Sequence, residues 1–403
     1  MPLIRTFISH ADDDKKRIEG TLRKLSPFGV RPWLDREELM NRIGGSLSKA
    51  IREGVTKECQ SMILFLSEKS VKSKWVEREV ESALSLLEEG FRIIPVYLDA
   101  PDKIKLKAVF VEALRQRSSK PDTLYLRVDD ALFCEKVTAS LFSACGLDEM
   151  QELVLHLGHR LDMWSAQIPQ EWRHVPALDL RLDFPLGNEK CSPTAEEWAE
   201  VQKGLRIIKS RLRSVKKVRV CGYAPLGVGA LVGHVWDRGT NVQITCWNGR
   251  QEEEWHGIAP QEEQETVDWT PDNGSAVVLQ DQMNLYAVTD EVVVALMYKS
   301  EQAEHSKKLA LSMRIPWVWF KPTMFAGNPD DAKCILRESI GAIRWIVCTY
   351  PQIECLNIVT GLPLALIPLL VQQLKRYRKM RFFDHIYNAT DPSKMYQEAA
   401  TWT

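Results

Sequence analysis

Three blocks of polar and aromatic residues near the N-terminus have the residue types and spacing of a catalytic site. They are Phe7-Ile8-Ser9-His10 followed by a run of aspartates, the segment from Trp33 and Asp35 to Ser46, and Trp75-Val76-Glu77-Arg78-Glu79. An apolar run that predicts a β-strand precedes each block. Ligands bind at the carboxyl ends of parallel strands, so the three blocks predict one shared ligand site.

Glu79 is the candidate catalytic residue of this site. A helix that starts near Lys74 buries a stripe of apolar side chains, and Glu79 lies at the margin of that stripe, one helical turn after Trp75. A carboxylate in this place can stabilise a positive charge that develops on a ligand. The alternative is that Glu79, between Lys74 and Arg78, is a solvated helix charge, and the local residues leave both interpretations open.

A parallel sheet covered by helices must hold these blocks. Over residues 1–145, apolar strand-like runs alternate with amphipathic helix-like segments, which predicts a compact α/β domain of flavodoxin-like type. The expected strands are Ile4–Ser9, Arg31–Leu34, Ser61–Leu66, Arg92–Leu98 and Thr123–Leu126, and the expected helices are Asp13–Leu25, Ser46–Gly54 and Lys74–Glu89.

The three blocks resemble the motifs of the TIR family. The likeness rests on an F-I-S box at Phe7 to Ser9, a D-x-x-x-L then G-x-S loop from Asp35 to Ser46, and an S-x-W-V-x-x-E helix opening from Ser73 to Glu79. The resemblance implies a TIR domain over residues 1–147 in which Glu79 is catalytic. It also implies that Phe7, Ser9, Trp33, Asp35, Ser46 and Trp75 surround NAD, and that Asp35, Glu38, Gly44 and Gly45 belong to an assembly loop.

The reaction implied by this resemblance breaks the bond between nicotinamide and ribose in NAD. Its transition state carries positive charge on the ribose, which a single glutamate can stabilise while binding the ribose hydroxyls. Nicotinamide leaves as a neutral base, so no strong general acid is required. Many TIR domains are adaptors without activity, and the alternative is therefore a scaffold that recruits a partner through the same loop.

The second part of the chain contains an internal repeat. Lys217 to Asn248 can be laid without a gap over Cys355 to Ile386, at an offset of 138 residues. Each copy predicts a strand, a turn of glycine and proline, an apolar helix and a second strand, which is a βαβ unit. We expect two Rossmann-like halves, about residues 148–265 and 266–403. Their turns are expected to offer helix N-terminal amides to phosphate, unless they only make tight connections.

This repeat also resembles the SAVED domain, a sensor of cyclic oligonucleotides built from two fused CARF-like units. The likeness rests on Leu231 to His234, the strand Val292 to Leu296 and the run from Leu362 to Leu374. The two resemblances together imply a TIR-SAVED effector of CBASS antiphage defence. A cyclic oligoadenylate, such as the trimer, would bind residues 148–403 and drive self-association into oligomers or filaments. The candidate nucleotide contacts are Tyr223, Pro225, Leu226, His234, Trp247, Asn248, Lys299, Thr360, Gly361, Leu362 and Trp402.

Composition argues against several other classes of protein. The charges of the 53 basic and 54 acidic residues nearly cancel. We therefore expect the protein to bind neither long nucleic acid nor an anionic membrane surface. The nine cysteines lie singly, without a CxxC pair, which predicts reduced thiols in a cytoplasmic protein and no bound metal. The most apolar stretch, Leu356 to Val371, is too short to span a bilayer. NAD is the expected substrate, and no cofactor is expected.

One further alternative places the chemistry in the second part of the chain. That part could itself be an enzyme that acts on nucleotides. Neither copy of the repeat contains paired carboxylates or a metal-binding cluster, which argues against a nuclease. The acidic run from Gln251 to Gln264 is interpreted as a solvated face.

Overall fold

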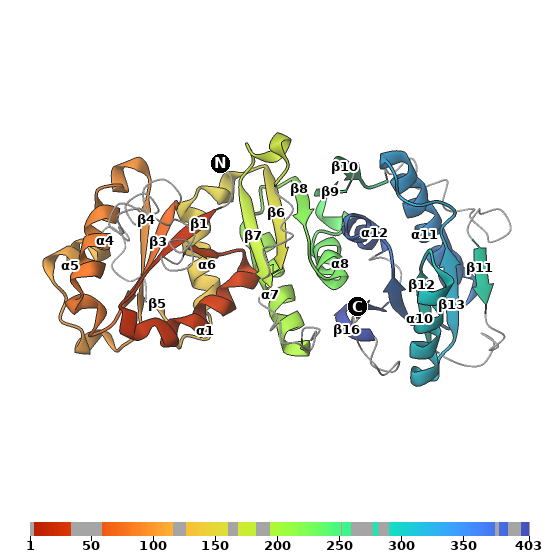
Figure 1. Ribbon diagram of the computed structural model, residues 1–403, viewed down its shortest axis with the longest axis horizontal. Coiled ribbons are helices and arrows are strands. Elements are labelled where there is room, and N and C mark those ends of the chain that lie inside the picture. The colour runs from red at the N-terminus through yellow and green to blue at the C-terminus, as the bar shows by residue number, and fades with distance from the viewer. Residues whose placement is uncertain are drawn as a thin grey trace. The chain divides into compact units, whose positions relative to one another are not determined.

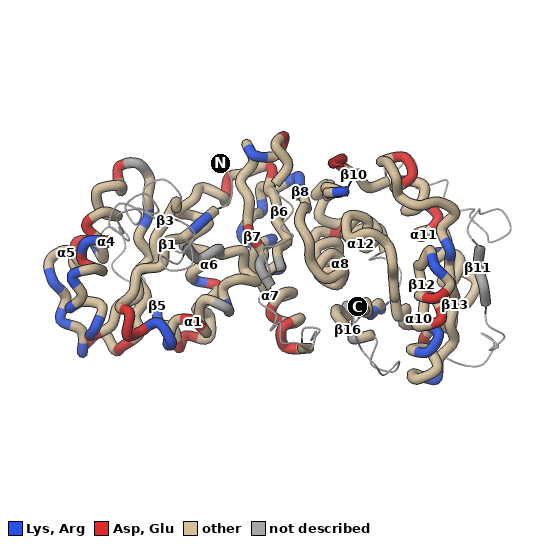
Figure 2. The backbone as a smooth tube through the Cα atoms, viewed as in Figure 1, with Lys and Arg blue, Asp and Glu red and all other residues tan. Residues whose placement is uncertain are grey.

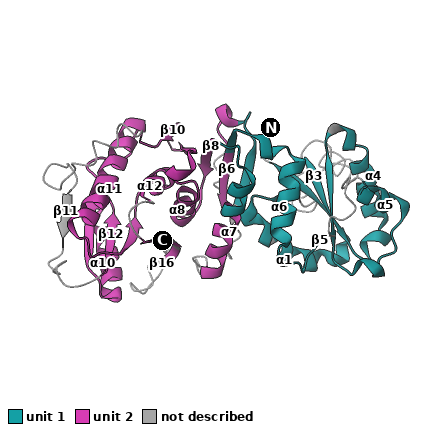
Figure 3. Ribbon diagram, turned by 180° about the vertical axis from the view of Figure 1, so that it is seen from behind, with its two compact units in different colours: residues 1–153, 173–181, 206–215 teal, residues 154–172, 182–205, 216–403 magenta. Residues whose placement is uncertain are grey.

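The computed structural model describes residues 4–33, 59–115, 126–159, 168–182, 194–250, 252–258, 277–280, 290–374, 379–385 and 396–402. The chain divides into two compact units (Figure 3). Unit 1 comprises Met1–Leu153, Arg173–Arg181 and Arg206–Val215, and unit 2 comprises Val154–Trp172, Leu182–Leu205 and Lys216–Thr403. None of the helices in the described ranges has the length and apolar character that crossing a membrane requires.

Unit 1 contains a five-stranded sheet in the order β2-β1-β3-β4-β5 (Figure 1). All four strand pairs are parallel. This is the flavodoxin-like order, so the predicted fold class of the N-terminal part is confirmed. The strands are β1 (Arg5–Ser9), β2 (Arg31–Trp33), β3 (Ser61–Leu66), β4 (Arg92–Tyr97) and β5 (Leu126–Arg127), and the helices are α1 (Lys15–Leu25), α4 (Lys74–Leu84), α5 (Ala108–Arg115) and α6 (Phe133–Ala144).

Helix α4 is held against one face of this sheet. Phe7 of β1 and Met62 of β3 share an apolar cluster with Val76 and Val80 of α4. The helix begins after Ser73, whose side chain accepts a hydrogen bond from the N–H of Val76 and so satisfies one of the unpaired N–H groups of the first turn. This packing and this cap fix the position of the helix that carries Glu79.

Unit 2 is built from two related sheets. The strands of the first repeat are ordered β10-β9-β8-β6, and those of the second are ordered β11-β13-β12-β14-β15-β16. The first repeat contains β6 (Glu152–His159), β8 (Lys217–Gly222), α8 (Leu226–Val235), β9 (Gln243–Asn248) and β10 (Glu253–His256). The second contains β11 (Val277–Gln280), β12 (Glu291–Leu296), α10 (Ser300–Met313), β13 (Trp317–Lys321), α11 (Pro329–Thr349), β14 (Cys355–Thr360), α12 (Ile367–Leu374), β15 (Lys379–His385) and β16 (Tyr396–Trp402).

The remaining strand and α-helix of the described residues lie between β6 and β8 in the sequence. They are β7 (Ala177–Leu182) and α7 (Ala195–Arg211). Within unit 1, the N–H of Ile4 donates to the carbonyl oxygen of Ala177 at 2.9 Å. The compact unit that contains the N-terminal sheet therefore also takes in a strand from beyond residue 153.

The two repeats agree in strand direction and in the turn that follows the first shared strand. β8 and β9 are parallel and β10 is antiparallel to β9, while β14 and β15 are parallel and β16 is antiparallel to β15. Pro225 has φ −53° and ψ 145°, and Pro363 has φ −56° and ψ 144°. The N–H of Val228 donates to the oxygen of Pro225 at 3.1 Å, and the N–H of Leu366 donates to that of Pro363 at 2.9 Å. These matching turns support the predicted duplication.

The strand after each helix corrects the ungapped alignment of the two copies. Val220 pairs with Cys246, whereas Ile358 pairs with Phe382, so the offset falls from 138 residues to 136 residues at this strand. The second copy is thus two residues shorter between its turn and its second strand. Because side chains alternate with a period of two, this shift leaves the same positions facing the core.

Helices α8 and α12 pack together where the two repeats meet. A Cβ atom added to Gly233 would lie 2.4 Å from the carbonyl oxygen of Pro368, so this approach requires glycine. Nε2 of Gln372 donates to the carbonyl oxygens of Trp236 at 2.7 Å and Val242 at 2.9 Å. Neither helix contains Asp, Glu, Lys or Arg (Figure 2), as expected of helices buried on each other.

Candidate functional site

A buried pair, Ser9 and Glu79, lies where the order of the N-terminal sheet reverses. β1 and β3 are neighbours, and ligands of open α/β sheets bind beyond the carboxyl ends of strands at such a reversal point. Ser9 ends β1, and its Oγ donates to Oε2 of Glu79 at 2.6 Å. Glu79 is only 5% exposed. The hydroxyl orients the carboxylate, which is able to stabilise positive charge on a ligand at this edge of the sheet.

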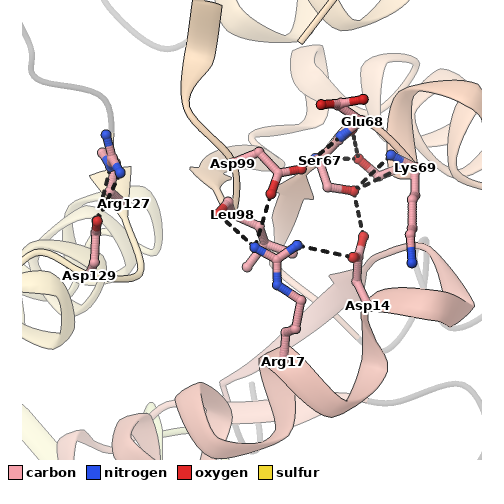
Figure 4. Close-up of polar contacts among 10 residues, drawn as sticks. Asp14, Arg17, Ser67, Glu68, Lys69, Leu98, Asp99, Arg127 and Asp129 are labelled. Carbon is pink, nitrogen blue, oxygen red and sulfur yellow. Dashed lines mark hydrogen bonds and ion pairs between the residues drawn. The ribbon is translucent and has the colours of Figure 1, made fainter. Parts of the chain in front are cut away.

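A second polar cluster lies at the carboxyl ends of β3 and β4 (Figure 4). Oδ2 of the fully buried Asp14 accepts a hydrogen bond of 2.5 Å from Oγ of Ser67. The same Oγ accepts hydrogen bonds from the N–H groups of Lys69 at 3.2 Å and Ser70 at 2.9 Å. The turn that leads from β3 toward α4 is therefore fixed by Asp14.

Arg17 joins this cluster to the end of β4. Its Nη2 donates to the carbonyl oxygen of Leu98 at 2.9 Å and to Oδ1 of Asp99 at 3.0 Å (Figure 4). Burial opposes ionisation of Asp99, but the N–H of Glu68 and the guanidinium of Arg17 together hold its pKa below the ordinary value. Asp14 belongs to the aspartate run noted in the sequence, but periodicity could not show which member of the run points inward.

Unit 2 has a corresponding reversal point in its second repeat, between β12 and β14. In the sheet, β13 lies on the outer side of β12, and β15 lies on the outer side of β14. The N–H of Gly361 donates to the carbonyl oxygen of Leu296 at 3.0 Å, and Oγ1 of Thr360 donates to the same oxygen at 3.2 Å. Lys299 follows β12 and is exposed. The reversal point thus presents a cation beside a turn that is fixed to its neighbouring strand.

The first repeat has a matching turn after β8. The N–H of Tyr223 donates to the carbonyl oxygen of Leu157 in β6 at 2.8 Å, as the N–H of Gly361 does to β12. The side chain of Tyr223 is 61% exposed. An aromatic ring is therefore available to a ligand at this edge.

Comparison with known proteins identifies the N-terminal part of the chain. Residues 6–125 match the TIR domain family. This part of the chain is a TIR domain. The match includes β1 and α4, so the Ser9 and Glu79 pair belongs to it. No curated protein matches the chain.

The solved structures that are similar over most of the chain include two SAVED/CARF-domain receptors. One is the Acinetobacter baumannii Cap4 SAVED/CARF-domain containing receptor with the cyclic trinucleotide 3'3'3'-cAAA, at 10% identity and a TM-score of 0.46, covering 88% of this chain and 84% of that chain. The other is the Moraxella osloensis Cap4 SAVED/CARF-domain containing receptor, at 12% identity and a TM-score of 0.40, covering 99% of this chain and 87% of that chain.

The predicted NAD contacts of the TIR domain have different environments. Ser9 contacts Glu79 directly, and Trp75 is half-buried against the core cluster under α4. Phe7 is fully buried in that cluster, so its side chain packs the core. The backbone of Trp33 ends β2. Asp35, Glu38, Gly44, Gly45 and Ser46 lie outside the described residues.

The predicted nucleotide contacts also separate into exposed and buried residues. Tyr223 and Lys299 are exposed, and Pro225, Leu226 and Gly361 are half-buried. Trp247 packs edge-to-face on Trp172, with ring centroids 5.6 Å apart. The buried candidates are His234, Asn248, Thr360 and Leu362, and Trp402 is placed only through the backbone of β16. Tyr223 and Lys299 are therefore the most available to a ligand.

The N-terminus of α8 is already occupied, which corrects the expectation that its amides would be open to phosphate. The N–H of Gly227 donates to Oδ1 of Asp384 at 3.0 Å and to Oδ2 at 3.1 Å. Asp384 belongs to β15 of the second repeat and is 5% exposed. A side-chain carboxylate thus takes the place that phosphate was expected to have.

The buried carboxyl of Asp384 predicts a pH-dependent stability. Burial raises its pKa from 3.8 to about 7, although the N–H groups of Gly227 and Leu226 favour the ionised form. Between about pH 4 and pH 7 the folded protein therefore holds a proton that the unfolded chain has lost, and the free energy of unfolding falls as the pH rises through this window. Urea unfolding at about pH 5 and pH 7.5 should show a decrease of roughly 2 to 3 kcal/mol that Asp384→Asn removes. Equal decreases in both proteins would contradict the assignment.

Part of the acidic run after β9 is not a solvated face, contrary to the interpretation from the sequence. Glu254 lies in β10, where its carboxylate contacts Nη1 of Arg219 at 3.1 Å and Nζ of Lys217 at 3.3 Å. Burial opposes ionisation of Glu254, but these two cations help to hold its pKa below the ordinary value. Arg219 also lies over the ring of Trp172, 5.3 Å from its centroid. These side chains join three neighbouring strands.

Proposed function

We propose that the TIR domain of this protein cleaves NAD at the nicotinamide–ribose bond when a cyclic oligonucleotide binds residues 148–403. The observation that carries the proposal is the buried hydrogen bond between Ser9 and Glu79 at the reversal point of the TIR sheet. A solvated helix glutamate would be screened by water, whereas a buried carboxylate interacts more strongly with a nearby charge.

The charge that develops during cleavage matches this carboxylate. As nicotinamide departs with the bonding electron pair, positive charge spreads over the ribose, and Glu79 stabilises it more strongly in the transition state than in bound NAD. Ser9 Oγ donates to Oε2 of Glu79 and so orients the carboxylate that would bind the ribose hydroxyls. Water then bonds to the ribose carbon in place of nicotinamide and loses one proton to solvent, which gives ADP-ribose.

The proposed sensor is a SAVED domain of two CARF-like repeats. Support comes from the shared strand order and from the matching turns at Pro225 and Pro363. Exposed Tyr223 offers a ring to a base, and exposed Lys299 offers a cation to phosphate. A cyclic oligoadenylate, such as cyclic tri-adenylate, combines repeated bases and phosphates in a form that suits a duplicated domain.

The proposed switch is self-association into oligomers or filaments. We assign Asp35, Glu38, Gly44 and Gly45 to a loop through which TIR domains complete each other's NAD sites, together with Trp33 and Ser46. Ligand that binds the assembled state more tightly than the separate protomers shifts the population toward assembly. NAD cleavage is then coupled to the nucleotide signal without a change in the chemistry of Glu79.

One experiment tests the proposed function as a whole. The full chain is incubated with NAD and a panel of cyclic di-, tri- and tetranucleotides, while nicotinamide release and particle size are followed. We expect release and larger particles only with the activating nucleotide. Nucleotide-dependent assembly without nicotinamide release would instead support a TIR scaffold, and binding of no cyclic nucleotide would contradict the sensor.

Ser9→Ala tests the positioning of Glu79. The change removes a hydrogen bond to a charged group and is expected to lower kcat for nicotinamide release by roughly tenfold to a hundredfold, with a smaller effect on KM. Ser61→Ala is a matched control, because Ser61 is also buried but hydrogen bonds to Thr6 instead. Equal losses of kcat in the two variants would show that Ser9 has no special part in orienting Glu79.

A further inference from the structure

An exposed aromatic ring lies beside the reversal point of the second repeat. Phe325, in the connection between β13 and α11, is 68% exposed. It stacks on Tyr298, with ring centroids 4.6 Å apart and an interplanar angle of 28°. One face of the Phe325 ring is covered by Tyr298, so the exposure comes largely from the rest of the ring. Exposure of this apolar surface to water is unfavourable, and an aromatic ring of a ligand would cover it.

The stack is at the edge of the sheet where a ligand is expected. Tyr298 follows β12, one of the two strands that flank the reversal point, and Lys299 is the next residue. Lys299 is exposed and precedes the first residue of α10. A ring able to stack on a base and a cation able to bind phosphate therefore come from neighbouring positions at this edge of the sheet.

The connection that carries Phe325 is held at both ends. Near β13, Glu338 of α11 accepts hydrogen bonds from the N–H of Thr323 at 3.1 Å and from its Oγ1 at 2.5 Å. Near α11, the side chain of Asn328 caps the helix by accepting from the N–H groups of Asp330 and Asp331. These bonds limit the entropy that ordering the segment on a ligand would cost, so the ring is preorganised for stacking.

We propose that Phe325, backed by Tyr298, is a stacking platform for one base of the cyclic oligonucleotide, with Lys299 contacting the adjacent phosphate. This inference rests on the proposed sensing function and deepens it by naming the residues of one base site. Stacking recognises the faces of a base rather than its hydrogen-bonding edge. Because a purine has a larger face than a pyrimidine, the platform contributes more affinity for purines.

The test measures binding of cyclic tri-adenylate to the full chain and its Phe325→Ala and Phe325→Trp variants by calorimetry. We expect Phe325→Ala to raise the Kd by about tenfold and Phe325→Trp to keep it within about threefold of the original value. Leu311→Ala is the matched control. Leu311 is 55% exposed in the last turn of α10, near the start of β13 and away from the carboxyl ends of the strands. We expect this control to leave the Kd unchanged.

The outcomes separate this inference from the proposed function. Binding by the unsubstituted protein with an unchanged Kd for Phe325→Ala would overturn the platform and leave the sensing function intact. Equal losses for Phe325→Ala and Leu311→Ala would also overturn it, because they would indicate a general surface effect. If the unsubstituted protein binds no cyclic oligonucleotide, the sensing function and the platform fail together. A parallel test with cyclic tri-uridylate should show a smaller effect of Phe325→Ala.

Discussion

Glu79→Gln is expected to lower the ligand-dependent rate of nicotinamide release by at least about a hundredfold. Glutamine has nearly the same shape and can still accept the hydrogen bond from Ser9, which the structure shows at 2.6 Å. It lacks the negative charge that stabilises the ribose in the transition state. The loss should therefore appear in kcat, while folding and nucleotide binding stay unchanged. Release of nicotinamide under saturating NAD and cyclic tri-adenylate measures it.

Glu81→Gln is the matched control for this change. Glu81 lies on the same helix but is exposed, so its removal takes away a solvated charge of the same kind. We expect this variant to keep the original rate within about twofold, because exposed charges are screened by water. Full activity of Glu79→Gln, or equal losses in the two variants, would refute the catalytic assignment of Glu79.

Gly222→Ala is expected to have the largest effect on the stability of unit 2. Gly222 ends β8 with a φ of +107°, a conformation that L side chains rarely adopt. An added Cβ would also lie 2.0 Å from the carbonyl oxygen of Leu157, so the backbone of β6 would have to move. The combined strain and overlap should lower the free energy of unfolding by about 3 to 5 kcal/mol. Calorimetric unfolding measures this loss.

Gly257→Ala provides the comparison for Gly222→Ala. The nearest atom to a Cβ at Gly257 is Nε2 of Gln373 at 3.5 Å, which is an ordinary contact. We expect a change in the free energy of unfolding of about 1 kcal/mol or less. A loss as large as that of Gly222→Ala would contradict the role given to the Gly222 backbone. Because the turn after β8 presents Tyr223, Gly222→Ala should also weaken binding of cyclic tri-adenylate.

The sequence predicted several strands of the TIR sheet well because each contains neighbouring apolar residues between polar segments. β3 was predicted with the bounds that the structure has, and β1 and β4 differ from their predictions by one residue. The helices α5 and α6 were not predicted. The helix that carries Glu79 ends at Leu84 and is followed by a short 3-10 turn, rather than continuing to Glu89.

The Ser9–Glu79 contact was only partly predictable. Helical periodicity placed Glu79 at the margin of a buried stripe, and strand periodicity placed Ser9 at the end of β1. The contact between them depends on how α4 packs on the sheet, which periodicity does not contain. Asp14 was missed for a similar reason, because its hydrogen bond with Ser67 joins positions that lie far apart in the chain.

In the second part of the chain, the repeat was visible but its ligand-facing residues were not. The matching turns at Pro225 and Pro363 follow from a local pattern of glycine, proline and apolar residues. Occupation of the α8 N-terminus by Asp384 depends on a contact between the two repeats. The stack of Tyr298 and Phe325 joins residues from two separate connections. The one sequence signal for this stack is the presence of an aromatic residue, Phe325, in a connection between two elements.

A titration of the full chain with cyclic tri-adenylate at fixed NAD tests the central claim most directly. Nicotinamide release and nucleotide binding are measured in the same samples. We predict negligible release without nucleotide and a rise in release that follows occupancy of the nucleotide site. Release at the same rate with and without bound nucleotide, or saturated binding with no release, would contradict the proposed coupling between the sensor and Glu79.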